Sequence, residues 1–402
     1  MARFVLLAIA SLGLLATVRA SFLKSAKRMA RYEINLDIEP KLRFREFAKA
    51  NCDDLAMLMT GLSLINAVGG RGMPPWDTPK WLKHHNFKQE RLDEMRGIVD
   101  ECHHPSVSMN NLIMFNLVYS TSTFKACSAV LAVDKDNHVV HGRNLDYSNI
   151  HYTVHGQKKD MQTMTAEMLF TRGGRPQYVS VGLLGFMGAH TAMKLTEPRW
   201  TFQQNTHHTN EQKENLAAAM EGGLDFGLFW RDILEEGEGV DYHAAIKRVQ
   251  EANFNAPQYF ILSGQEPWQG VSIEIQRGLQ PAGEEMMVSL SEKDNKWFLI
   301  QTNDQIRQPP RDPRRPSGTF FMKTKGRDWI DKEHMLTTMR SFPIFNPETL
   351  WTFITVPATG YYQTVLRDDN REQGSNMTEL MKGTEEEKTM LASVNMKIRT
   401  SH

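Results

Sequence analysis

The segment from Cys127 to Tyr147 constrains the fold more than any other part of the chain. Cys127–Val133 (CSAVLAV) is a short apolar run, the turn-forming residues 134–137 (DKDN) follow, and a second run begins with HVVHG. This order predicts a β-hairpin. If the turn is centred between Lys135 and Asp136, Cys127 faces Asn144. A shift of one residue would exchange the two faces of the strand, and the sequence leaves that choice open.

Helical and strand patterns alternate along the rest of the chain without a βαβ rhythm. They predict an α+β fold with two layers of antiparallel strands and flanking helices. We expect helices at residues 42–67, 92–99, 214–234 and 241–252, and strands at residues 32–40, 177–183, 258–262, 271–275, 287–290, 297–301 and 351–356. The glycine-rich segment 182–188 (GLLGFMG) is typical of a tight turn after a strand, and the tail after residue 368 is polar.

Composition excludes several classes of function. The 402 residues include 47 Lys and Arg against 47 Asp and Glu, so the formal net charge is zero. No global basic field is present to bind nucleic acid, and we expect no such partner. The chain has no G-x-S-x-G, H-E-x-x-H, C-x-x-C or P-loop motif. Three pairs of adjacent histidines occur, but adjacent side chains diverge on a helix or strand, so we expect no metal and no cofactor.

The first twenty residues have the pattern of a secretory signal peptide. Arg3 precedes an apolar run over residues 4–18, and small residues stand at the cleavage positions around Ala20. This run is shorter than the ~20 residues that span a bilayer. The sequence therefore predicts entry into the secretory pathway, with a lysosomal or extracellular destination. Asn376 begins the sequon N-M-T, which predicts a glycosylation site there.

The compartment affects how the three cysteines are interpreted. Cys52, Cys102 and Cys127 form an odd number, so at least one of them is unpaired within the chain or pairs with another chain. One simple solution joins Cys52 to Cys102 and leaves Cys127 free. A buried free thiol is the alternative for either of the first two.

The hairpin brings chemically useful side chains close to Cys127. Arg143 and Asp146 lie on the returning strand, within reach of the cysteine in either register. A neighbouring guanidinium lowers the pKa of a thiol and favours the nucleophilic thiolate. A carboxylate there could orient a base or accept a proton. A structural Arg–Asp pair beside a buried cysteine is the alternative.

The same segment resembles a known family. Cys127 followed by residues 141–147 (HGRNLDY) is similar to the signature of the acid ceramidases and N-acylethanolamine acid amidases, relatives of the choloylglycine hydrolases. Further segments resemble that family at residues 35–40 (NLDIEP), 256–264 (APQYFILSG), 301–303 (QTN), 312–315 (DPRR) and 366–368 (LRD).

The resemblance implies an N-terminal nucleophile hydrolase fold, a four-layer αββα arrangement with two antiparallel sheets. Such proteins cut themselves before the nucleophile, here between Ala126 and Cys127. This would give an N-terminal α-subunit, residues 21–126, and a catalytic β-subunit, residues 127–402. A freed α-amino group, with an unperturbed pKa of about 7.7–8.0, could then serve as the base of its own cysteine.

The resemblance also assigns roles to single residues. Cys127 would attack an amide carbonyl to give a thioester, and Asn303 would donate to the oxyanion. Arg143 would position the nucleophile and the acyl carbonyl, and Asp146 would hold the α-amino group. Arg314 matches the first of the paired arginines of the family. Further candidates are Asn144, Tyr147 and Glu211.

The function implied is hydrolysis of fatty N-acyl amides, ceramide or N-acylethanolamine, to fatty acid and amine. No cysteine follows Cys127, so the two fragments would form a non-covalent heterodimer. A lipid-presenting activator protein is a further candidate partner. The alternatives are an amidase of the penicillin or bile-salt type, and a catalytically lapsed relative that binds lipid or protein.

The chain departs from the pattern of the family in places that bear on catalysis. Thr206 stands where the family has a glutamate, and Glu211 is the next glutamate along the chain. Ser128-Ala129 replaces the usual Thr-Ser, and Pro313 replaces the second aspartate before the paired arginines. Two additional residues lie between Tyr119 and Cys127. The absent glutamate is the only support for the lapsed relative.

Overall fold

The computed structural model describes residues 29–67, 87–117, 127–147, 151–154, 156–209, 211–281 and 286–367. The predicted signal peptide, Ala126, Asn376 and the polar tail lie outside these residues. Within the described part, no helix is both long enough and apolar enough to cross a membrane.

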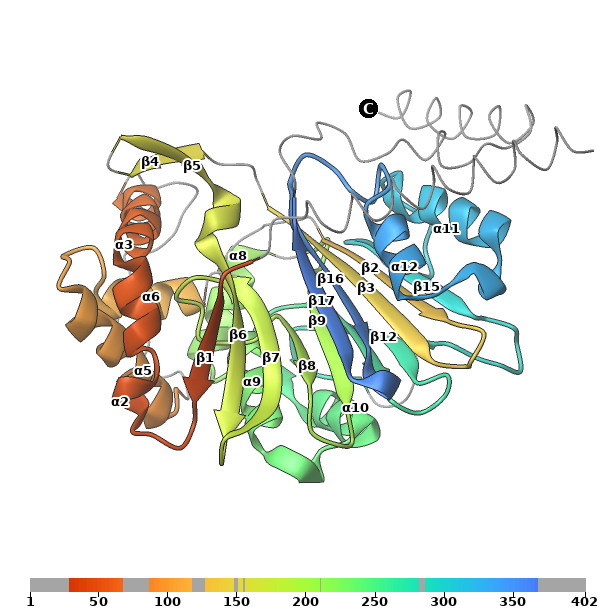
Figure 1. Cartoon of the computed structure of the whole chain (residues 1–402), viewed down its shortest axis with the longest axis horizontal. Helices are drawn as coiled ribbons and strands as arrows, with labels where there is room; N and C mark the ends of the chain where they lie inside the picture. Colours follow the sequence, from red (N-terminus) through yellow and green to blue (C-terminus); the bar gives the residue numbers. More distant parts are fainter. Residues whose placement is uncertain are drawn as a thin grey trace, which may run out of the picture.

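Two β-sheets form the centre of the molecule (Figure 1). The larger sheet has eight strands in the order β1-β6-β7-β8-β9-β11-β12-β14, and the smaller has five in the order β15-β2-β3-β16-β17. The strands of the larger sheet are β1 (Arg31–Asn35), β6 (Thr165–Arg172), β7 (Arg175–Leu183), β8 (Thr191–Lys194), β9 (Trp200–Thr206), β11 (Gln258–Gly264), β12 (Gly270–Ile275) and β14 (Met287–Ser289). Those of the smaller sheet are β15 (Phe298–Gln301), β2 (Cys127–Val133), β3 (Val139–Asp146), β16 (Thr349–Val356) and β17 (Tyr361–Leu366).

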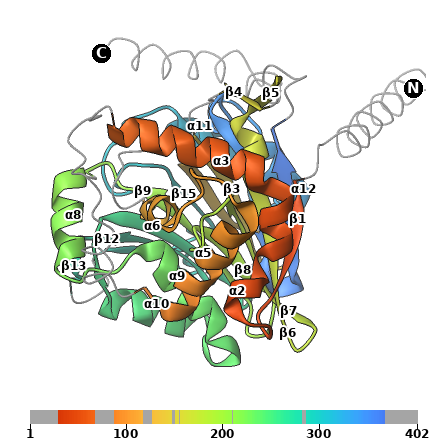
Figure 2. The same ribbon diagram turned by 90° about the vertical axis from the view of Figure 1, so that its left-hand side faces the viewer.

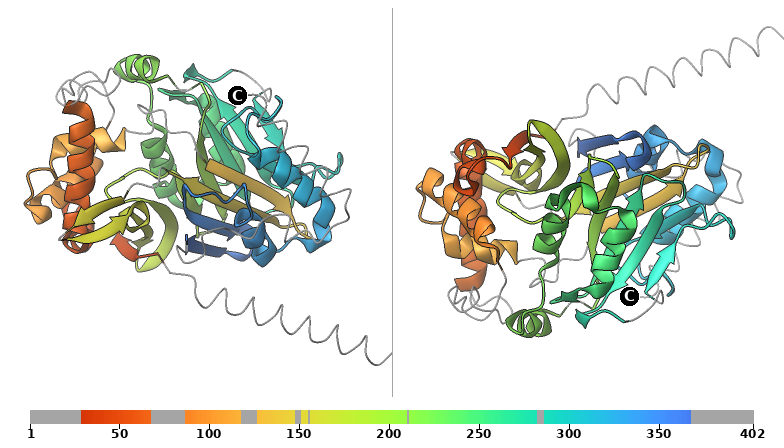
Figure 3. Two further views of the ribbon diagram at one scale, coloured as in Figure 1. Left: turned by 90° about the horizontal axis from the view of Figure 1, so that it is seen from above. Right: turned by 90° about the horizontal axis from the view of Figure 1, so that it is seen from below.

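Helices cover the outer faces of both sheets. Helices α11 (Arg314–Lys325) and α12 (Lys332–Met339) pack on the smaller sheet through an apolar cluster that includes Val130, Phe321 and Met335. The other helices are α2 (Pro40–Arg43), α3 (Arg45–Ala67), α5 (Gln89–Cys102), α6 (Met109–Asn116), α8 (Gln212–Met220), α9 (Phe226–Glu235) and α10 (Tyr242–Glu251). Seen from above and below, the red and orange N-terminal helices lie at the opposite end of the molecule from the blue α11 and α12 (Figure 3). The layers are therefore helix, sheet, sheet, helix.

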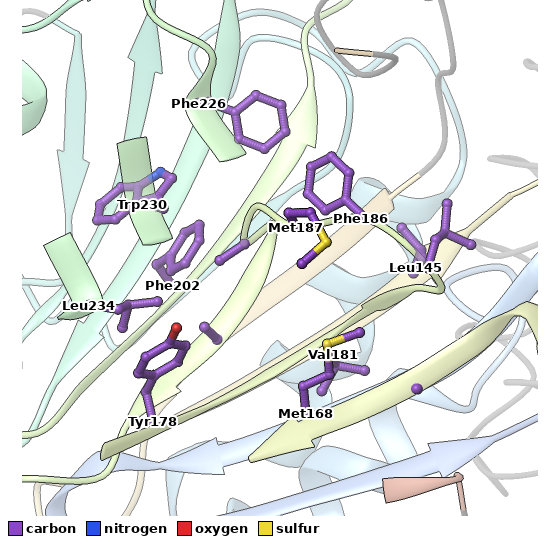
Figure 4. Close-up of a cluster of buried hydrophobic side chains, with 14 of the residues drawn as sticks. Leu145, Met168, Tyr178, Val181, Phe186, Met187, Phe202, Phe226, Trp230 and Leu234 are labelled. Carbon is purple, nitrogen blue, oxygen red and sulfur yellow. The ribbon is translucent and has the colours of Figure 1, made fainter. Parts of the chain in front are cut away.

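The largest apolar cluster covers both faces of the larger sheet, and α9 contributes to it on one face. Trp230 of α9 stacks on Phe202 of β9 with ring centroids 4.2 Å apart, and Leu234 lies beside them (Figure 4). Burial of such aromatic side chains is worth roughly 1.5–3 kcal/mol each. This packing fixes β9, which delivers part of the site described below.

The expected α+β fold with two sheets is confirmed, but the larger sheet is not wholly antiparallel. Strand β1 pairs with β6 in parallel orientation, with Arg31 opposite Glu167. Strand β1 also ends at Asn35, before the expected end at residue 40, because Pro40 begins α2. Parallel pairing is available to β1 because the long connection from β1 to β6 contains α3, α5 and α6 and can return the chain to the same end of the sheet.

The expected hairpin forms, and its register, which the sequence left open, differs by one residue from that of a turn centred between Lys135 and Asp136. Cys127 pairs with Leu145 rather than with Asn144. The connection holds five residues, because Asp134 N donates to His138 O and Asn137 adopts a left-handed conformation with φ 66°. Oδ1 of Asp134 accepts from the backbone N of Asp136 and of His138, each at 2.9 Å. These turn bonds move the centre of the loop onto Asp136.

The helix expected over residues 214–234 is two helices, α8 and α9. Gly222 has φ 90°, a conformation that terminates α8. Asp225 then begins α9, because its Oδ1 accepts from the backbone N of Gly227 at 2.9 Å. The pairing of Cys52 in α3 with Cys102 in α5 is present as a disulfide, and Cys127 is free and buried.

Candidate active site

Cys127 is the first residue of β2 and is only 3% exposed. Because Cys127 pairs with Leu145 and Ala129 pairs with Arg143, Cys127 and Arg143 share the face that looks toward the larger sheet. Asn144 and Asp146 lie on the opposite face. The observed register therefore places the guanidinium, and not the amide of Asn144, beside the thiol.

Asn303 contacts the backbone of Cys127 directly. The pairing of Gln301 with Ala129 continues the β15–β2 ladder, so that two residues later Asn303 comes opposite Cys127. Oδ1 of Asn303 accepts from Cys127 N at 2.9 Å, and Nδ2 donates to the carbonyl oxygen of Thr206 at 2.9 Å. An amide group has two N–H bonds, so Nδ2 has one more to offer.

Arg314, the first residue of α11, holds the other backbone group of the cysteine. Its Nη1 donates to Cys127 O at 2.8 Å, and its Nη2 donates to Asn303 Oδ1 at 3.0 Å. Asp312 orients the guanidinium through bonds to Nε at 3.1 Å and Nη2 at 2.8 Å. Cys127 N and O are thus both fixed by side chains from the end of β15 and the start of α11.

Asp146 is buried and supports Arg314 rather than Cys127. Its Oδ2 lies 3.5 Å from Arg314 Nη1, and its two oxygens accept from Thr349 Oγ1 at 2.6 Å and Asn346 Nδ2 at 3.1 Å. Burial raises the pKa of this carboxyl, although Arg314 acts in the opposite direction. In the intact chain Asn303, and not Asp146, contacts the nitrogen of Cys127, and the expected role of Asp146 at a freed α-amino group stays a prediction.

Arg143 is fully buried and only partly engaged. Its Nη1 donates to Gln204 O at 2.8 Å and to Asn205 Oδ1 at 3.1 Å, and its guanidinium lies 5.4 Å from the ring centroid of Trp351. Among the described residues, its Nε and Nη2 have no nitrogen or oxygen partner, and a hydrogen bond from the Arg143 side chain to the Cys127 side chain lowers the pKa of the thiol. Arg143 therefore has donors left for a further acceptor.

The thiol is not activated in this state. Burial raises the pKa of Cys127, Asp146 adds to the rise, and the two arginines Arg143 and Arg314 offset only part of it. A neutral thiol is the expected form while the site is closed. Opening the site to water, or adding a base beside the sulfur, would be needed to form the thiolate.

Two of the three further candidates, Asn144 and Tyr147, contact segments that follow in the sequence. Asn144 binds the last turn of α12 and the residues after it, through Nδ2 to Met339 O at 2.7 Å and to Ile344 O at 3.1 Å. Tyr147 is buried, which raises its pKa, and its backbone N donates to Glu348 O. Glu211 is exposed just before α8, and the described contacts include none between it and the site. The role of Glu211 as a site residue therefore stays a prediction.

Asn205 was not among the candidates, although it connects the two sheets at the site. Its Oδ1 accepts from Arg143, and its Nδ2 donates to Gln301 O at 3.0 Å and Thr302 O at 3.1 Å. The period-2 alternation of strand 200–206 could have placed it on the face toward Cys127, but the strand itself was not predicted. Within the described residues, no group of three or more His, Cys, Asp or Glu could hold a metal ion.

The two sheets lie between layers of helices, and a free cysteine begins a central strand. This is the fold of the N-terminal nucleophile hydrolases. The solved structure of a Caenorhabditis elegans N-acylethanolamine-hydrolyzing acid amidase ortholog matches it with a TM-score of 0.50 and 22% identity, covering 60% of this chain and 100% of that chain.

Sequence comparison gives more specific relatives. The chain is 25% identical over 351 residues to N-acylethanolamine-hydrolyzing acid amidase of Rattus norvegicus, covering 84% of this chain and 88% of the relative. It is 26% identical over 351 residues to acid ceramidase of Homo sapiens, with 84% and 86% covered. No model of a protein family matches the chain. The chain is thus similar to the acid ceramidases and N-acylethanolamine acid amidases along most of its length.

Proposed function

We propose that this protein hydrolyses fatty N-acyl amides after cutting its own chain before Cys127. The observation that carries the proposal is that side chains hold both backbone groups of Cys127, Asn303 at its nitrogen and Arg314 at its oxygen. In an ordinary buried strand, the backbone groups of a cysteine bond to neighbouring strands and not to side chains. The similarity to acid ceramidases and N-acylethanolamine acid amidases supplies the substrate class.

Cleavage before Cys127 would create the base that the buried thiol lacks. The nitrogen of Cys127 is an amide in the intact chain and would become an α-amino group, whose unperturbed pKa is about 7.7–8.0. Asn303 Oδ1 already accepts from this nitrogen and would keep it oriented. The amine could then take the proton of the thiol on the same residue.

In the reaction that follows, the sulfur of Cys127 attacks the amide carbonyl while the α-amino group takes the thiol proton. The second N–H of Asn303 and the remaining donors of Arg143 stabilise the oxyanion. Collapse breaks the C–N bond, and the proton passes to the leaving amine. Water then attacks the thioester, the fatty acid departs, and the thiol recovers its proton.

The cellular setting and the assembly belong to the same proposal. The N-terminal pattern and the Cys52–Cys102 disulfide support passage through the secretory pathway toward a lysosomal or extracellular site. The disulfide lies wholly before Cys127, so the fragments 21–126 and 127–402 would form a non-covalent heterodimer. A lipid-presenting activator protein would help to deliver an insoluble substrate.

A panel of amides tests the activity. The protein, incubated near pH 4.5 and compared with Cys127→Ala, is offered a ceramide, an N-acylethanolamine, a conjugated bile acid and a penicillin in detergent micelles. We expect release of fatty acid from one or both lipid amides by the native chain alone. Hydrolysis of the bile acid or penicillin only would overturn the substrate class, and activity in neither protein would favour the lapsed relative.

A further inference from the structure

A closed ring of four buried charges lies between helices α5 and α9, which are neighbours in Figure 2. Arg231 Nη2 contacts Glu94 Oε1 at 2.7 Å, and Arg231 Nε contacts Glu235 Oε1 at 2.9 Å. Arg91 Nη1 contacts Glu94 Oε1 at 3.3 Å, and its Nη2 contacts Glu235. None of the four side chains is more than 8% exposed. Each charge therefore has an opposite charge on both sides.

The proposed cut would divide this ring into two halves. Arg91 and Glu94 come before Cys127, whereas Arg231 and Glu235 come after it. Each fragment would carry one cation and one anion of the ring. The two halves complete each other only when α5 lies on α9 in a single register, because a shift would place like charges together.

Neighbouring groups hold the ring in place from both sides of the cut. Arg231 also donates to Met187 O at 2.7 Å, and its guanidinium lies 5.0 Å from the ring centroid of Phe170 and 5.6 Å from that of Phe44. Tyr178 OH donates to Glu235 Oε1 at 2.9 Å. From the N-terminal fragment, which also contains Phe44, Arg43 Nη1 contacts Glu94 Oε1 at 3.1 Å.

We propose that this ring is a latch that keeps the N-terminal fragment docked on the C-terminal fragment after cleavage. The inference rests on the proposed function, which supplies the cut. Apolar burial and the β1–β6 strand pair provide the bulk of the interface. The ring adds register and a slow off-rate, because removing one member of a buried, hydrogen-bonded charge pair acts mainly on dissociation.

The latch is suited to acidic surroundings. Arg231 and Arg91 outweigh the effect of burial and lower the pKa of Glu235 from 4.5 to about 2. Tyr178 OH donates to this carboxylate, and the other acidic groups of the cluster, Glu94 and Asp232, contact the same arginines rather than Glu235 itself. A lowered pKa gives a contribution that is complete above about pH 4.5 and is lost only as the pH falls toward 2. Glu235 is thus expected to keep its charge, and its part in holding the fragments together, between pH 7 and 4.5.

The test separates the latch from self-cleavage. In a Cys127→Ala chain, residues 119–125 are replaced by the recognition sequence of a specific endopeptidase, and the purified chain is cut in vitro. Dissociation of a labelled N-terminal fragment is followed by exchange against excess unlabelled fragment at pH 7 and 4.5. The variants are Glu94→Gln, Arg231→Met and the double variant. Circular dichroism of each uncut chain verifies folding.

Lys88→Met is the matched control, since Lys88 also pairs across the proposed cut, with Asp232 at 3.0 Å, but is 57% exposed. We expect the fragments of each ring variant to dissociate about 30-fold faster than those of the parent, or more. In the double variant, the loss of binding free energy should be smaller than the sum of the losses in the two single variants. The control should dissociate at the rate of the parent. Equal rates for Arg231→Met and Lys88→Met, or immediate separation of the parent fragments, would overturn the latch. Neither result depends on whether the native chain cuts itself.

Discussion

At the scale of single residues, the structure assigns different surroundings to the two asparagines that were candidates for the site. Asn303 contacts the backbone of Cys127, whereas Asn144 faces away and binds the carbonyl oxygens at the end of α12 and just beyond it. The register of one hairpin causes this difference. Asn303 is therefore expected to act on the reaction and Asn144 on stability.

Replacing each asparagine tests this separation. Asn303→Asp keeps the acceptor for Cys127 N but removes the N–H donors, so kcat on an N-acyl amide is expected to fall by about 10²–10³. Asn144→Ala leaves buried backbone oxygens without donors and is expected to cost about 1–3 kcal/mol of stability. Its kcat for each correctly processed molecule should stay close to that of the parent. Steady-state kinetics measures kcat, and thermal unfolding measures the stability of each variant. A loss of kcat in Asn144→Ala and a loss of stability alone in Asn303→Asp would contradict the assigned positions.

At the scale of elements, the turn between β2 and β3 determines which side chains lie beside the thiol. Asp134 organises that turn through two backbone bonds, whereas the neighbouring Asp136 is exposed and contacts only Lys135 through its side chain in the described structure. Asp134→Ala is expected to lower the free energy of unfolding by about 1–2 kcal/mol. Asp136→Ala should leave the unfolding temperature unchanged. Calorimetry of the two variants measures their unfolding temperatures. Equal shifts of the unfolding temperature in both variants would argue against the role of the Asp134 hydrogen bonds in the turn.

At the scale of the whole molecule, the disulfide links two helices of the N-terminal layer. Cys52 and Cys102 are 50 residues apart and join α3 to α5. Cys52→Ser with Cys102→Ser is expected to cost about 2–4 kcal/mol of stability. A reducing agent should lower the free energy of urea unfolding of the parent by a similar amount. It should leave the free energy of unfolding of the double variant unchanged. A reductant-induced shift in the double variant would show that another thiol is responsible.

Much of this architecture could be predicted from the sequence, because strands such as β2, β11 and β12 are short apolar runs between turn residues. The residues that clamp Cys127 were named from the resemblance alone. Asn205 and the charge ring could not be found in this way. Both arise where segments distant in the sequence meet, as when Glu94 reaches Arg231, and no local pattern encodes that contact.

The central claim is that Cys127 becomes the N-terminus of a new chain. N-terminal mapping by mass spectrometry, after incubation of the secreted protein near pH 4.5, tests it most directly, with Cys127→Ala in parallel. The account predicts a new N-terminus at Cys127 in the native protein and an intact chain in the variant. An intact chain in both, or a cut at the same bond in both, would contradict it.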